Sequence, residues 1–188
     1  HVSIAGEAPR VAGNRCAALA GDFTSMVRFA TKADGTLFSR CDPQGKWAPG
    51  NKALFVQDGN LVYDIGWLGA MSGGPKVNDG KAHTALLVVK AGTARLWLDG
   101  KVVAQQKNFT QPDPAATVFK VGRATDDFGG DFAGGTIASV YGWNRALPEQ
   151  EIASLWKNGV IAANTTDFSY VPKTIDRPTI TGARGWVQ

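Results

Sequence analysis

Short stretches in which apolar and polar residues alternate recur along the chain, and they predict β-strands. In the clearest one, Phe23, Ser25, Val27 and Phe29 fall on one face and the residues between them on the other. Period two is typical of a strand with one buried face. Similar stretches cover residues 36–40, 53–57, 61–65, 94–98, 101–104 and 117–121, and residues 82–90 form a longer apolar run typical of a central strand. We therefore expect about nine or ten short strands.

Turn signals between these stretches predict how the strands pair. Asp34-Gly35, Asp58-Gly59 and Asp99-Gly100 each separate two predicted strands. An Asp-Gly pair suits a tight hairpin turn, which needs positive φ, so each pair predicts an antiparallel hairpin. The breaker-rich stretches 42–50, 66–80 and 122–135 are expected to be loops. Antiparallel hairpins in this number are most economically packed as two sheets.

A strand, a turn and the one predicted helix follow each other late in the chain. Ile137, Ser139, Tyr141 and Trp143 alternate with the residues between them and are expected to share one strand face. Pro148 then suits the first position of a helix. The spacing after it changes to i, i+3, i+4, and the apolar stripe consists of Ile152, Leu155 and Trp156. The helix is therefore short and lies on another element.

Composition favours one domain with its own core. The 188 residues are 44% apolar and 19% charged, and no apolar run reaches the length of a membrane span. The net charge of +4 weakly favours an acidic partner, but the 20 Lys and Arg are dispersed, and a solvated surface also explains them. Residues 1–160 are expected to form the domain and residues 161–188 an extended strap or a linker to a further domain.

The two cysteines leave two alternatives open. Cys16 and Cys41 form one disulfide or remain two buried thiols. Their spacing does not suggest a zinc site.

Several motifs in a fixed order resemble the laminin-G-like branch of the concanavalin A-like lectin/glucanase superfamily. They are VNDGKAH at residues 77–83, LWLDG at 96–100, VG at 121–122, FAGGTI at 132–137 and YGWNRAL at 141–147, followed by Glu151-Ile152. The resemblance covers residues 20–158 and is most specific at its end. It implies an all-β fold: a two-sheet antiparallel β-sandwich, or jelly roll, with one short C-terminal helix.

The chain has no recognisable catalytic motif. Glycoside hydrolysis usually needs two facing carboxylates, and the glucanases of the superfamily carry them as ExDxxE on one strand. The only three glutamates are Glu7, Glu149 and Glu151, which do not match that pattern, and the signatures of the related alginate lyases are also missing. An enzyme is therefore disfavoured, with a polysaccharide hydrolase or lyase kept as a remote alternative.

Aromatic and basic residues suggest a glycan-binding site. Trp47, Tyr63 and Trp67 fall in or beside loops and could stack on sugar rings, although core packing is the alternative for each. Arg28 and Arg40 would hold a carboxylate or sulfate if they converged on one sheet, which would favour an acidic polysaccharide. Solvent-facing positions are the alternative for both arginines.

Asp127 and Asp131 crowd a glycine-rich loop that a calcium ion could occupy. Members of the resembled family often bind one calcium ion at the sheet rim, so the resemblance implies Ca2+ at Asp127 and Asp131, with Asp22 as a weaker partner. A plain solvated loop is the alternative.

These observations predict a non-catalytic, lectin-like module of a larger secreted or cell-surface protein, which binds a glycan, with an acidic polysaccharide as the candidate ligand. The alternative is a protein–protein adhesion module of laminin-G or pentraxin type. Neither reading involves nucleic acid or a membrane span.

Overall fold

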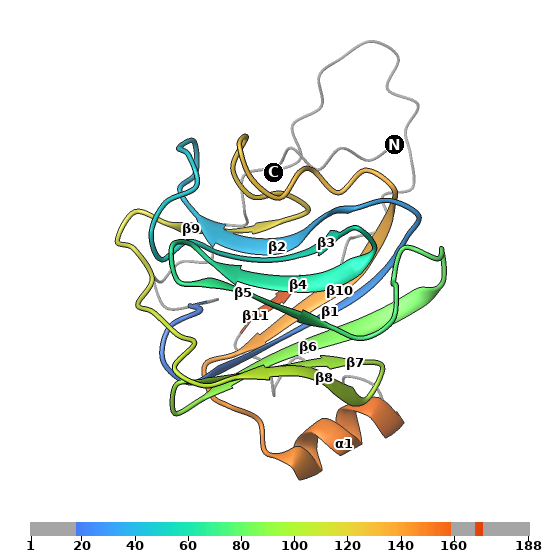
Figure 1. The fold of residues 1–188 in the computed structure, drawn as a ribbon. Helices are drawn as coiled ribbons and strands as arrows, with labels where there is room; N and C mark the ends of the chain where they lie inside the picture. Colours follow the sequence, from blue (N-terminus) through green and yellow to red (C-terminus); the bar gives the residue numbers. More distant parts are fainter. Residues whose placement is uncertain (1–17, 159–167, 171–188) are drawn as a thin grey trace.

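The computed structural model describes residues 18–158 and 168–170, and in these residues two antiparallel sheets pack face to face (Figure 1). The six-stranded sheet has the order β11 (Phe168–Tyr170), β10 (Gly135–Trp143), β1 (Phe23–Thr31), β6 (Ala82–Lys90), β7 (Thr93–Leu98) and β8 (Lys101–Gln106). The five-stranded sheet has the order β5 (Gly69–Gly73), β4 (Asn60–Ile65), β3 (Lys52–Gln57), β2 (Gly35–Cys41) and β9 (Val118–Val121). The predicted β-sandwich is confirmed.

The main core lies between the sheets and comes from the alternating positions that the sequence marks as apolar. Val27, Leu54, Leu87 and Leu96 are fully buried there. Burying one such side chain stabilises the fold by roughly 1.5–3 kcal/mol. The core therefore fixes the register of the strands, since a slip by one residue would turn each of these side chains to the outer face.

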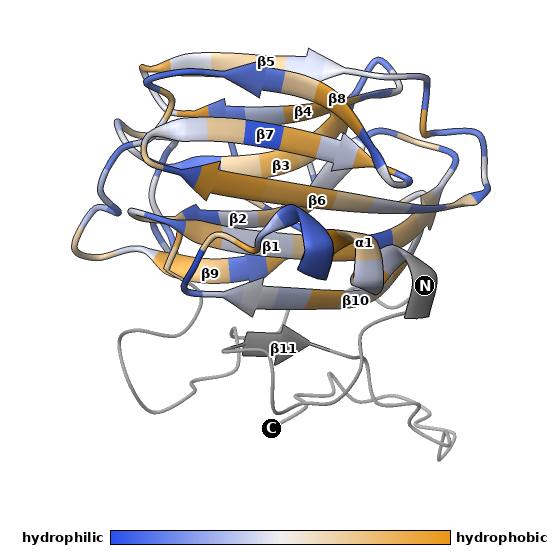
Figure 2. Cartoon of the chain, turned by 90° about the horizontal axis from the view of Figure 1, so that it is seen from below, coloured by the Kyte–Doolittle hydropathy of each residue, from blue (hydrophilic) through white to orange (hydrophobic). Residues whose placement is uncertain are grey.

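The helix α1 (Glu149–Asn158) covers the outer face of the six-stranded sheet, as Figures 1 and 2 show. Its buried Ile152 and half-buried Leu155 and Trp156 pack in a second cluster with Leu86 of β6 and Trp143 of β10. The predicted apolar stripe is confirmed. No helix in the described part of the chain has both the length and the apolar character needed to cross a membrane.

Two of the three Asp-Gly turns form hairpins, and the third does not. Asp58-Gly59 and Asp99-Gly100 have positive φ at both residues and join β3 to β4 and β7 to β8. The predicted hairpin at Asp34-Gly35 is wrong, because β1 and β2 lie in different sheets. The carboxylate of Asp34 instead accepts hydrogen bonds from the backbone N–H groups of Asp58 and Gly59. Asp34 thus stabilises a neighbouring turn where the chain crosses between the sheets.

The predicted face of the late strand is only partly right. The register between β1 and β10 shifts between Arg28 and Phe29, which pair with Ser139 and Ile137. This irregularity moves Val140 into the core together with Ile137, while Trp143 packs under α1 on the outer face. A bulge changes the side-chain alternation, so a strict period of two cannot assign the faces here.

The predicted loop 66–80 contains a strand, β5, that pairs with β4. Its sequence, GAMSG, has little intrinsic strand propensity, and the pairing comes from the neighbouring strand. In the predicted strap, β11 pairs with β10, and the remainder of residues 161–188 lies outside the described residues. The domain boundary therefore stays a prediction.

Candidate functional site

A cluster of aromatic side chains covers the outer face of the five-stranded sheet. Phe55 of β3 and Val62 of β4 point outward because their neighbours in the strands point into the core. Trp47, from the loop between β2 and β3, stacks on Phe128, from the loop between β9 and β10, with 3.8 Å between ring centroids and 6° between planes. Phe55 and Phe128 pack edge to face, with 5.3 Å between their ring centroids. Two loops distant in the sequence are thus held together by ring packing.

Two carboxylates fix the orientation of Trp47. The backbone N–H of Trp47 donates to Asp127 Oδ1 at 2.9 Å, and its indole donates to the carboxylate of Asp64 on β4. Burial raises the pKa of Asp64 to about 6, although the indole hydrogen bond acts in the opposite direction. The pKa of Asp127 is lowered, mainly by the hydrogen bond from the backbone N–H of Trp47. Asp64 is therefore a carboxyl that changes its charge near neutral pH.

Trp67 lies in the turn between β4 and β5, next to Gly66, whose backbone contacts the loop that carries Trp47. Its predecessor Gly66 touches the Trp47 loop so closely that a Cβ there would lie 2.2 Å from the carbonyl oxygen of Ala48. Trp67 itself has a φ of 63°, a left-handed backbone conformation that is unfavourable for residues other than glycine. Its side chain is nevertheless 72% exposed. We call Trp47, Asp64, Trp67 and Phe128 the aromatic rim.

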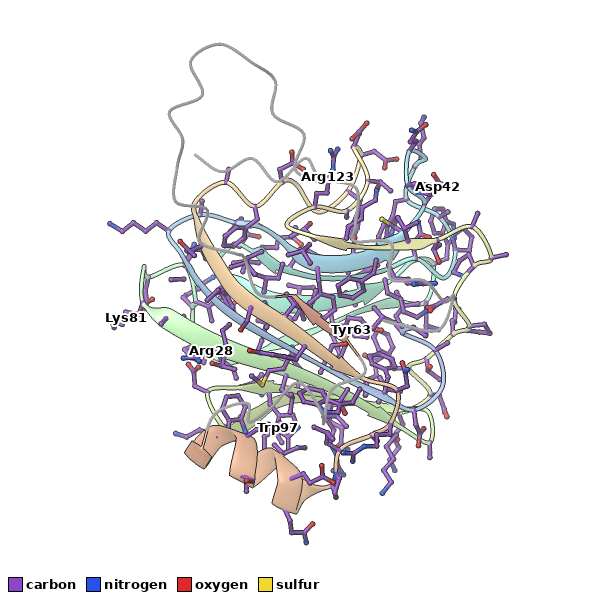
Figure 3. All side chains as sticks on the ribbon, turned by 180° about the vertical axis from the view of Figure 1, so that it is seen from behind. Arg28, Asp42, Tyr63, Lys81, Trp97 and Arg123 are labelled. Carbon is purple, nitrogen blue, oxygen red and sulfur yellow. The ribbon has the colours of Figure 1, made fainter. Side chains whose placement is uncertain are left out.

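The structure excludes one of the three predicted stacking residues. Trp47 is half-buried and Trp67 is exposed, but Tyr63 lies fully buried between the sheets (Figure 3), with its ring edge against Phe109. Burial raises the pKa of the Tyr63 hydroxyl well above its usual value. The prediction that Tyr63 contacts a ligand is therefore wrong, because its ring belongs to the main core.

Arg28 and Arg40 do not converge on one sheet, so the condition for a shared site for an acidic group is not met. Arg28 is exposed on β1 in the six-stranded sheet, whereas Arg40 lies on β2 in the five-stranded sheet. Arg40 Nε lies 3.2 Å from Asp113 Oδ2, and Asp113 also accepts a hydrogen bond from the fully buried Lys52 at 2.6 Å. Burial lowers the pKa of Lys52, against the attraction of Asp113. Arg40 therefore belongs to an ion-pair cluster at the end of the core.

The three predicted calcium ligands do not all come together. Asp131 has its backbone beside Gly35, which follows the end of β1, and Asp22 lies before the start of β1, where it accepts a hydrogen bond from the backbone N–H of Ala91. A strand of this length spans roughly 30 Å. Among the described residues no group of three or more His, Cys, Asp or Glu side chains is arranged to hold a metal ion. Calcium at Asp127 and Asp131 stays a prediction.

The disulfide prediction also stays open. Cys41 is buried beside Ser39, with 3.4 Å between Sγ and Oγ, and Cys16 lies outside the described residues.

Asp64 and Phe128 were not among the site residues predicted from the sequence. Asp64 alternates with the inward-facing Tyr63 and Ile65, so its position on the outer face could be inferred from the strand pattern. Phe128 gave only a weak signal, as an aromatic residue within a glycine-rich loop. Its contact with Trp47 requires two loops that only the folded sheet brings together.

The fold and its surface place the chain in a known class. An antiparallel β-sandwich of two sheets is the architecture of jelly rolls. The family model Laminin_G_3, described as the concanavalin A-like lectin/glucanases superfamily, matches residues 17–153. The chain belongs to this superfamily.

Solved structures show the same fold at low sequence identity. The CBM40 of the Ruminococcus gnavus IT-sialidase, bound to α2,3 sialyllactose, matches with a TM-score of 0.62 and 13% identity, over 72% of this chain and 83% of that one. A heptameric SAP-like pentraxin from Limulus polyphemus matches with a TM-score of 0.56 and 17% identity, over 75% and 72% of the two chains. The leech intramolecular trans-sialidase matches with a TM-score of 0.60 and 15% identity, over 76% of this chain and 24% of the enzyme. The comparison with curated proteins finds no match.

Proposed function

We propose that this protein is a non-catalytic carbohydrate-binding module and that the aromatic rim is its glycan site. The observation that carries the proposal is Trp67, whose ring is 72% exposed although its backbone has a φ of 63°. An exposed aromatic residue in a strained conformation is typical of a surface kept for binding. The similarity to a CBM40 solved with sialyllactose supports this choice.

The rim combines the two kinds of contact that hold a sugar. Trp67 presents an apolar face on which the C–H groups of a pyranose ring can stack. Asp64 supplies carboxylate oxygens that can accept hydrogen bonds from sugar hydroxyls, in an orientation set by Trp47. Phe128 and Asp127 hold Trp47 in place from the other side. The rim does not include Arg28 or Arg40, so its own chemistry favours the neutral part of a glycan.

We further infer that the module works within a larger protein that is secreted or displayed at a cell surface. Its fold matches about a quarter of the length of the leech trans-sialidase, which supports a role as one domain beside others. The module would then raise the local concentration of a polysaccharide for its partner domain.

The experiment is a glycan array followed by calorimetry on the best ligand, in calcium and again in chelator. We expect Trp67→Ala to abolish detectable binding and Leu68→Ala, at the adjacent exposed apolar residue, to leave the affinity within about twofold. Loss of affinity in chelator would support the predicted calcium ion. Glycan binding that survives Trp67→Ala would refute the proposed site.

A protein partner is the second candidate, and it rests on a different property of the same turn. Trp67 and Leu68 together form an exposed apolar pair, and the pentraxin with a similar fold is a heptamer. A protein interface would use both side chains, so Leu68→Ala would weaken it about as much as Trp67→Ala. A silent glycan array would favour this candidate over the lectin-like one.

A further inference from the structure

A groove lies on the other outer face of the sandwich, between the six-stranded sheet and the start of α1. It encloses about 530 Å³, and its walls come from β6, β7, β8 and the first turn of the helix. This face is opposite to the aromatic rim, because the rim covers the five-stranded sheet (Figure 1). The volume lies within the range of sites that hold small ligands. We call it the basic groove, after Lys90, Arg95 and Lys107.

Positive charge dominates the lining of the groove. Lys90, Arg95 and Lys107 face one acidic lining residue, Glu149. The three cations come from separate segments: Lys90 ends β6, Arg95 lies on β7 and Lys107 follows β8. Because the strands are adjacent in the sheet, the three cations line the same groove. A basic groove of this kind favours an anionic ligand.

Arg95 is oriented for such a ligand and is only weakly occupied by the protein. Its Nε donates to Gln105 Oε1 at 2.7 Å, across the rung where the two residues pair, which fixes the plane of the guanidinium. Its Nη1 reaches Glu149 Oε1 at 3.4 Å, a long contact to a side chain that is 73% exposed. Exposed ion pairs of this type contribute little, so an incoming carboxylate or sulfate can displace Glu149.

The inner wall of the groove is apolar. Val88, Trp97, Leu147 and Ile152 line it, and Figure 3 shows Trp97 between the sheet and the helix. Glu149 and Gln150, in the first turn of α1, line the groove and bring the positive end of the helix dipole to the same space. An apolar wall with cations at its edge suits a ring that carries an acidic substituent.

We propose that the basic groove is a second binding site, which takes a carboxylate- or sulfate-bearing sugar unit of an acidic polysaccharide. It shares no residue with the aromatic rim and does not depend on the rim being a glycan site. Arg95 binds the acidic group, while Lys90 and Lys107 attract the polyanion. A chain with both sites would hold a polysaccharide at two opposite faces.

The test compares three tetrasaccharides of similar size: an oligogalacturonate, a sulfated oligosaccharide and a neutral galactose oligomer. Binding is measured by calorimetry at low and physiological salt, and by the NMR signal of the Trp97 indole N–H. That group is buried and has no hydrogen-bond partner among the described residues, so its signal reports directly on the groove. We expect one or both acidic ligands to bind, to lose affinity with salt and to shift this signal. The acidic ligand that binds more tightly identifies the preferred group.

Charge variants give the expected effects opposite signs. Arg95→Gln should weaken the binding of the acidic ligand by about tenfold, and Glu149→Gln should strengthen it by a few fold. Arg28→Gln is the matched control, because it removes the same charge from an exposed position of the same sheet outside the groove. Trp67→Ala should leave this binding intact.

Three results would overturn the inference. The first is the lack of any preference for acid: the neutral ligand binds as tightly as the acidic ones, or neither acidic ligand binds. The second is a loss in Arg28→Gln as large as that in Arg95→Gln. The third is loss of acidic-ligand binding in Trp67→Ala but not in Arg95→Gln, which would place the acidic sugar at the aromatic rim and leave the proposed function standing.

Discussion

The strained backbone of Trp67 allows a sharp test of whether this residue is kept for binding. An L-residue in the left-handed region costs roughly 1–2 kcal/mol, a cost that glycine does not bear. At ordinary positions glycine is instead the less stable choice, by roughly 0.5–1 kcal/mol relative to alanine, because it loses more backbone freedom on folding. At position 67, where φ is 63°, the strain of an L-residue should exceed the entropic cost of glycine.

The comparison of Trp67→Gly with Trp67→Ala isolates this effect. Both variants lose the same ring with its partly buried area, so that contribution cancels in the difference. The glycine variant should be the more stable of the two by roughly 0.5–1 kcal/mol. Both variants should lose glycan binding. The order of stability is therefore the reverse of the usual one, while the order of function is unchanged.

Urea unfolding measures the difference. With a slope of about 2 kcal/mol per molar, the midpoint of the glycine variant should lie roughly 0.3–0.5 M above that of the alanine variant. Leu68 provides the control in the same turn, since its φ is not positive, and Leu68→Gly should be less stable than Leu68→Ala. If Trp67→Gly proves no more stable than Trp67→Ala, the strain argument for this residue fails.

Three further predictions concern charged groups. Asp64→Asn should raise the free energy of unfolding by on the order of 2 kcal/mol at pH 7 and hardly at pH 4. The folded-state pKa of about 6 lies above the unfolded-state pKa, so the folded protein loses stability as pH rises from the unfolded-state value to the folded-state value. Equal gains at both pH values in urea titrations would contradict this. Asp113→Asn should lower the free energy of unfolding by about 3 kcal/mol at pH 7 in the same assay, because the charged Lys52 stays buried without the carboxylate of Asp113. This loss should shrink toward about pH 10, where Lys52 gives up its proton, and a loss that does not shrink would refute this cause. Burial acts to lower the pKa of His83, but the hydrogen bonds and charges of Asp79 and Asp99 raise it overall. The free energy of unfolding of wild type, measured by thermal unfolding, should therefore exceed that of His83→Gln by about 1 kcal/mol or less near pH 5, and this difference should disappear above the folded-state pKa. A difference that persists at higher pH would exclude the ion pairs as its cause.

The fold was predictable because local and long-range preferences agree over most of the chain. Residues 23–29 form a strand whose Phe23, Val27 and Phe29 face the main core, and Asp99-Gly100 forms the predicted hairpin turn. The opposite face of that strand is also largely buried, with Met26 in the cluster under α1. The failure at Asp34-Gly35 has a physical cause: an Asp-Gly pair permits a sharp reversal but does not decide whether the next strand joins the same sheet. That choice depends on packing across the whole sandwich.

The candidate sites were predictable only in part. Tyr63 could have been assigned to the core, since it alternates in step with Leu61 and Ile65. Trp47 and Trp67 were found because breaker residues surround them. The basic groove could not be predicted from the sequence, because Arg95, Lys107 and Glu149 line one groove only when three strands and a helix pack together.

Two costs to stability coincide at the aromatic rim, and their coincidence argues for a function there. Trp67 holds an unfavourable φ, and Asp64 carries a carboxylate that burial disfavours. Neither cost is needed for packing, because glycine fits the first position better and a neutral amide could still accept the hydrogen bond of Trp47 at the second. Structural ion pairs such as Asp113 with Lys52 behave differently, since removing one partner there leaves a buried charge. Substitutions that relieve such a cost and weaken ligand binding therefore distinguish a binding surface from the scaffold that supports it, where substitutions lower stability.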